Sequence, residues 1–139
     1  IVVEKDEKER KLRKILNFGH TFAHAYEATL NYSKKLNHGE AVLLGMNTAL
    51  KLSYKKKVLE KKTFNSIIRH MKKSNLPIDI KKYFLSKDLN KIISYMTKDK
   101  KNNSKKINLI LLKKIGTPII DQKFQKDYLK SFLKKELIY

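Results

Sequence analysis

The sequence has no cysteine and no tryptophan, and it has only two prolines and four glycines among its 139 residues. The lack of cysteine excludes a disulfide framework, a thiolate zinc site and a cysteine nucleophile. No apolar run approaches the ~18 residues of a membrane-spanning helix, and no signal peptide is visible. We therefore expect a cytoplasmic protein, in a reducing compartment, with no membrane partner.

Acidic residues and arginine are also scarce. The chain carries 33 Lys and Arg against 13 Asp and Glu, a net charge of +20, yet only Arg10, Arg13 and Arg69 are arginines. Proteins that bind nucleic acid favour arginine for its two-pronged contacts, and here the lysines are dispersed along the chain. We do not expect nucleic acid to be the partner, and a basic nucleic-acid-binding helical module is the remote alternative.

Apolar residues make up 41% of the chain, enough for a core, and they recur mostly at helical spacing. We expect a mainly α, multi-helix, bundle-like domain with at most one small β-hairpin, and a single domain over residues 1–139. The predicted elements are helices from Asp6 to about Leu30, His38 to Val58, Glu60 to Ser74, an N-cap at Ser86, a strand at Ile107–Leu112 and a helix from about Gln122 to Glu136.

One predicted helix carries a stripe of polar residues separated by steps of four and three, which places them on one helix face. Its members are Arg13, Asn17, His20, His24 and Glu27.

The histidines of this region can be interpreted in two ways. His20 and His24 are spaced i, i+4, as in helical zinc sites, and His38 begins the next predicted helix as His38-Gly39-Glu40. The alternative is structural, with the imidazoles satisfied by hydrogen bonds inside a helical bundle. We expect Glu40 to cap the helix or to orient a metal-bound histidine, and His70 to be an exposed surface residue.

Two sequence blocks closely resemble the signature of the 3-dehydroquinate synthase family. The first spans residues 16–27, LNFGHTFAHAYE, and the second spans residues 38–46, HGEAVLLGM. A shorter match follows at residues 99–101, DKK, and continues at 107–112, INLILL. Ala23 stands where the family usually has glycine, a difference of one methyl group.

The resemblance implies that the chain is the C-terminal metal- and substrate-binding helical domain of a two-domain enzyme, with the N-terminal NAD-binding domain absent. Because the first residue is Ile1, we expect a piece of a longer protein, inactive alone. The implied cofactors are zinc, or cobalt, and NAD bound mainly by the missing domain. The implied roles are metal ligation by His20 and His38, with a third ligand from a Glu before this chain, catalysis by His24, Lys100 and Lys101, and substrate binding by Arg13 and Asn17.

The implied reaction belongs to the shikimate pathway of aromatic amino acid biosynthesis. It converts 3-deoxy-D-arabino-heptulosonate 7-phosphate, a small anionic sugar-acid phosphate, to 3-dehydroquinate and phosphate, so the enzyme is a carbon–oxygen lyase. The partners are this substrate, the chain's own N-terminal domain and, as an open option, a second copy in a homodimer. Another sugar-phosphate cyclase or a metal-dependent alcohol dehydrogenase of the same superfamily is the alternative.

Overall fold

The computed structural model describes residues 18–98, 106–114 and 117–138 of the chain. Over these residues it is mainly helical with one β-hairpin, which confirms the predicted fold class. The elements are α2 (His20–Thr29), α3 (His38–Lys55), α4 (Lys61–Lys73), η1 (Ile80–Lys82), η2 (Ser86–Asp88), α5 (Leu89–Thr97), β1 (Lys106–Lys114), β2 (Thr117–Gln125) and α6 (Lys126–Ile138).

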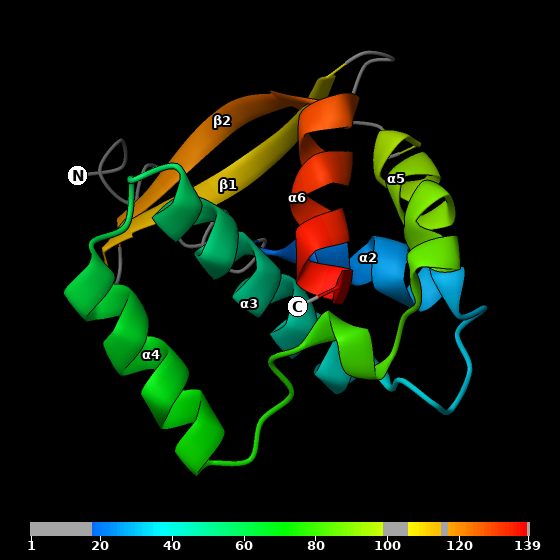
Figure 1. Cartoon of the computed structure of the whole chain (residues 1–139), viewed down its shortest axis with the longest axis horizontal. Helices are drawn as coiled ribbons and strands as arrows, with labels where there is room; N and C mark the ends of the chain where they lie inside the picture. Colours follow the sequence, from blue (N-terminus) through cyan, green and yellow to red (C-terminus); the bar gives the residue numbers. More distant parts are fainter. Residues whose placement is uncertain (1–17, 99–105, 115–116, 139) are drawn as a thin grey trace, which may run out of the picture.

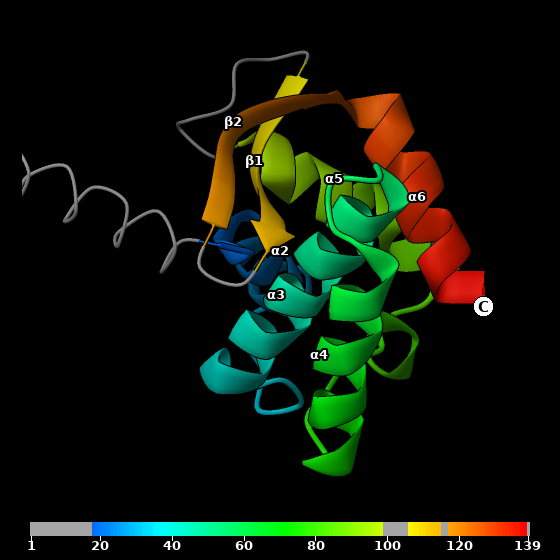
Figure 2. The same cartoon turned by 90° about the vertical axis from the view of Figure 1, so that its left-hand side faces the viewer.

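The two strands form an antiparallel hairpin that arches over one end of the helices (Figures 1 and 2). Ile107, Leu109 and Leu111 alternate with less buried residues along β1, so one face of the hairpin packs on the helices. The backbone N–H of Leu112 donates to Oγ of Ser53 at 2.9 Å, and this bond fastens β1 to the buried side of α3.

Three predicted helix boundaries are wrong. The first predicted helix does not run unbroken from Asp6, because Gly19 has a left-handed backbone and α2 begins at His20. The last helix begins at Lys126 rather than near Gln122, because residues up to Gln125 belong to β2. Phe124 has helical spacing to Tyr128, but its Cα pairs with Ile107 across the hairpin. Ser86 opens the short helix η2 rather than capping α5; Asp88 is the residue before α5, and its carboxylate accepts from the N–H of Leu85.

The core is built around an aromatic cluster at the centre of the helices. Tyr26 of α2 is fully buried and lies between Phe22 and Phe84, with ring centroids 6.3 and 5.2 Å away. Its hydroxyl lies 2.7 Å from Oγ1 of Thr48, whose own proton is donated to the carbonyl of Leu44. Tyr26 is therefore the donor in this pair, which satisfies its polar group inside the core.

The closest approach in the fold joins α2 and α3 at two glycines. Gly19 precedes α2 with φ of 80°, a left-handed conformation that glycine adopts without strain. A Cβ on Gly19 would lie 2.6 Å from the backbone of Gly45, and a Cβ on Gly45 would lie 2.3 Å from the carbonyl oxygen of Gly19. Only glycine at both positions allows the two helices to pack at this distance.

Within the part of the chain that the structure describes, no helix is both long enough and apolar enough to cross a bilayer.

We expect Gly45→Ala to lower the free energy of unfolding by about 1–3 kcal/mol, because the added methyl group would push against the Gly19 backbone. The matched control is Gly39→Ala near the start of the same helix, where the nearest atom to a new Cβ is Asn37 Oδ1 at 3.5 Å. Chemical denaturation of both variants measures the two free energies of unfolding. Equal losses from both substitutions would contradict the proposed contact.

Burial raises the pKa of Tyr26 far above its ordinary value. The unfolded chain loses this proton near pH 10 while the folded chain keeps it, so this contribution to stability is present below pH ~10 and declines above it. We expect the loss of stability between pH 9 and 11, measured by denaturation, to be smaller in Tyr26→Phe than in the parent. Tyr32→Phe, at an exposed tyrosine, should follow the parent profile.

Candidate functional site

The candidate site is a group of four side chains, which we call the polar strip: His20, His24 and Glu27 of α2 and His38 of α3. The three α2 residues are spaced i, i+4 and i+7 and share one face over about 10 Å of helix. The rings of His20 and His24 pack edge to face with centroids 5.6 Å apart. His38 contacts the strip at its far end, next to Glu27.

The contact between His38 and Glu27 determines which nitrogen of the imidazole carries a proton. Nδ1 of His38 lies 3.1 Å from Oε1 of Glu27. An ionised carboxylate only accepts hydrogen bonds, so Nδ1 is the donor, and in the neutral ring Nε2 then keeps its lone pair. The Glu27 side chain is 12% exposed and the His38 side chain 72% exposed, so a largely buried carboxylate holds an accessible ring.

A capping box fixes the backbone that carries His38. Oδ1 of Asn37 accepts from the N–H of Glu40 at 2.8 Å, and Oε1 of Glu40 accepts from the N–H of Asn37 at 3.1 Å. The other carboxylate oxygen of Glu40 accepts from the hydroxyl of Tyr83 at 3.2 Å. Burial and the charge of Glu40 raise the pKa of Tyr83. Glu40 therefore caps the helix, the first of its two predicted roles.

The predicted site residues fall into two groups. The structure packs the ring of His20 against that of His24 and places His38 beside Glu27, seven residues after His20, while His70 is exposed on α4 as predicted. His24 is also exposed, which argues against the purely structural interpretation of the histidines. Four other predicted residues lie outside the described residues: Arg13, Asn17, Lys100 and Lys101.

Among the described residues, no three His, Cys, Asp or Glu side chains converge closely enough to hold a metal ion. The donor types nevertheless fit one, because imidazole nitrogens are the usual ligands of zinc and also suit cobalt. A complete site would need at least one further ligand. The sequence places Glu27 on the same helix face as His24, three residues later, but this spacing alone predicts no role for its carboxylate.

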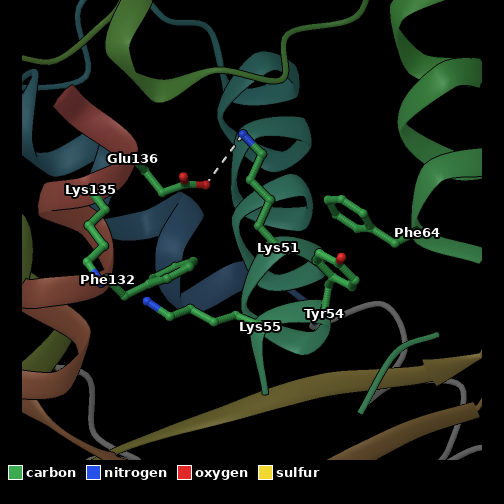
Figure 3. Close-up of a pocket in the computed structure, with 7 residues that line it drawn as sticks. All are labelled: Lys51, Tyr54, Lys55, Phe64, Phe132, Lys135 and Glu136. Atoms are coloured by element: carbon green, nitrogen blue, oxygen red, sulfur yellow. Dashed lines mark ion pairs between the residues drawn. The ribbon is translucent and has the colours of Figure 1, made fainter. Parts of the chain in front are cut away.

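A hollow of about 330 Å³ lies between α3, α4 and α6, apart from the polar strip (Figure 3). The stacked rings of Tyr54 and Phe64, with centroids 4.5 Å apart, face it from α3 and α4. On its other side Lys51 pairs with Glu136 at 3.6 Å, beside Lys55. Burial and the nearby charge of Lys135 lower the pKa of Lys55. No histidine lines this hollow.

Comparison with known proteins decides the family. A sequence profile described as "3-dehydroquinate synthase C-terminal" matches residues 1–102. The chain belongs to the 3-dehydroquinate synthase family. A 3-dehydroquinate synthase of Pelagibacter ubique (strain HTCC1062) is 61% identical over 136 residues, covering 98% of this chain and 37% of that protein. One from Leptospira interrogans (strain Fiocruz L1-130) is 48% identical over 120 residues, covering 86% of this chain and 32% of that protein.

The fold of this family member is also similar to that of a solved synthase structure. A crystal structure of 2-deoxy-scyllo-inosose synthase, complexed with carbaglucose-6-phosphate, NAD+ and Co2+, superposes with a TM-score of 0.66. It is 22% identical and covers 87% of this chain and 34% of that one, so the likeness shows the fold alone. The chain spans about a third of the length of the curated 3-dehydroquinate synthases that it matches.

Replacing the cap of α3 should loosen the backbone that carries His38. We expect Asn37→Ala to lower the free energy of unfolding by about 1 kcal/mol, because the N–H of Glu40 loses its side-chain acceptor. Asn65→Ala, at an exposed position inside α4, is the control and should be neutral or slightly stabilising. Thermal denaturation measures both, and an unchanged Asn37→Ala would contradict the capping role.

Proposed function

We propose that this chain is the C-terminal metal- and substrate-binding part of a 3-dehydroquinate synthase, and that the whole enzyme converts 3-deoxy-D-arabino-heptulosonate 7-phosphate to 3-dehydroquinate and phosphate. The observation that carries the proposal is the relative with 61% identity, which matches almost the entire chain. The polar strip supports it, since it gathers the histidines of both signature blocks on one surface.

In the proposed enzyme, His20 and His38 hold a divalent metal, and a preceding domain supplies a third ligand and most of the NAD site. The cobalt and NAD in the 2-deoxy-scyllo-inosose synthase structure support this pairing of cofactors. The metal, zinc or cobalt, supplies Lewis-acid polarisation of a substrate oxygen when bound. The presence of that preceding domain, a cytoplasmic location and a homodimer stay predictions.

The chain's own residues would bind and orient the substrate. His24 is exposed beside His20, so its ring can reach a ligand at the strip, where it would donate to an anionic oxygen or hold a proton. Arg13 and Asn17 precede His20 in the sequence, and the family resemblance supports the proposal that they bind substrate oxygens. Lys100 and Lys101 are proposed to add a cation for the phosphate or carboxylate.

A second candidate function is that of another sugar-phosphate cyclase, which the shared fold with 2-deoxy-scyllo-inosose synthase favours. The two functions differ in substrate: a heptulosonate phosphate carries a carboxylate as well as a phosphate. An assay of phosphate release with both classes of sugar phosphate would separate them.

Losing a residue that hydrogen-bonds a metal ligand typically weakens metal affinity roughly 10–100-fold. His20→Ala removes a proposed ligand itself, so we expect a larger loss of metal affinity in the full-length enzyme. Phosphate release from the heptulosonate phosphate should fall in parallel. The control is His70→Ala, an exposed histidine on α4, which should leave both measurements unchanged. A metal-loaded full-length enzyme that releases no phosphate, or an unaffected His20→Ala, would refute the proposed function.

A further inference from the structure

The residue of the polar strip that the proposed function leaves without a role is Glu27. Its carboxylate is mostly buried, yet the charge is not paired with a lysine or arginine among the described residues, despite the excess of basic residues. Its carboxylate oxygen Oε1 contacts Nδ1 of His38, 3.1 Å away. Burying a carboxylate costs free energy unless a hydrogen-bond partner compensates. For Glu27 that partner is Nδ1 of His38.

Glu40 cannot take this place, although it is the acid nearest to His38 in sequence. Both of its carboxylate oxygens are engaged, one by the N–H of Asn37 and the other by the hydroxyl of Tyr83. At the start of α3, Glu40 therefore caps the backbone, and Glu27 accepts a hydrogen bond from the ring of His38.

The fold brings Glu27 to His38 from eleven residues away. After α2 the chain turns back at once, since the N–H of Tyr32 donates to the carbonyl of Glu27 at 2.9 Å. Leu36, only 3% exposed, anchors the loop in the core just before α3 begins. The Gly19–Gly45 contact fixes the other end of the same helix pair. The Glu27 carboxylate is therefore presented to the ring by rigid elements on both sides.

We propose that Glu27 is the positioning residue for His38 as a metal ligand, an inference that rests on the proposed function. By accepting from Nδ1–H, the carboxylate selects the tautomer in which Nε2 is the ligating nitrogen and limits rotation of the ring. An exposed ring without this contact would sample several orientations and both tautomers. Binding a metal would then require that freedom to be lost, and affinity would fall.

The test measures zinc affinity of the full-length enzyme by competition with a chromogenic chelator, in parallel with the visible absorption spectrum of the cobalt-loaded protein. Glu27→Ala should weaken zinc affinity about 10–100-fold, and Glu27→Gln, which keeps an oxygen acceptor but loses the charge, should weaken it less. The cobalt spectrum should change in Glu27→Ala. Glu60→Ala, an exposed acid before α4, is the matched control and should match the parent.

A double-substitution cycle separates positioning from a general effect on folding. In a His38→Ala background, Glu27→Ala should change zinc affinity by less than about twofold, because the ring through which it acts is gone. A full additional loss in that background would overturn the inference, since Glu27 would then ligate the metal directly or support the fold. If His38→Ala lowers zinc affinity but Glu27→Ala does not, the inference fails alone; if His38→Ala has no effect, the proposed function of His38 fails.

Discussion

Helices α2 and α3 touch through their backbones at Gly19 and Gly45, and the candidate site depends on this contact. It is possible because neither residue has a side chain and because Gly19 adopts a positive φ. This contact holds the start of α2 against α3. Further along the helix pair, Tyr26 reaches Thr48 inside the core and Glu27 reaches His38 at the surface. The helix pair thus serves both the core and the polar strip, so packing and function constrain the same few residues.

The polar strip depends on contacts between α2 and α3 as well as on the periodicity of α2. A periodic set of polar side chains on α2 would by itself face solvent, with each ring free to rotate. The short return of the chain after α2 and the capping box at Asn37 bring a third histidine to the end of the strip. The histidines of the strip come from the two sequence blocks that carry the family resemblance.

Much of the fold was predictable because the apolar periodicity is strong. The helices at α3 and α4, the strand at β1 and the mainly α class follow from it. The errors lie where local spacing and tertiary pairing compete. Phe124 has helical spacing to Tyr128 and its ring stacks on that ring, yet its backbone pairs with Ile107 across the hairpin, a long-range pairing that local spacing does not reveal. Ser86 is a good capping residue, but Asp88 forms the bond that organises this turn.

By itself the sequence determined the shared face of His20, His24 and Glu27, the start of the helix at His38 and the family resemblance, because these depend on residue identity and on steps of three and four. It did not show that Gly19 interrupts the predicted helix before His20. Only the tertiary structure decided that Glu27 meets His38, that Glu40 is occupied by capping and by Tyr83, and that Gly19 faces Gly45. The physical reason is that these contacts join segments whose separation depends on how the loop after α2 turns and how closely two helices pack. Neither property can be read from periodicity along one helix.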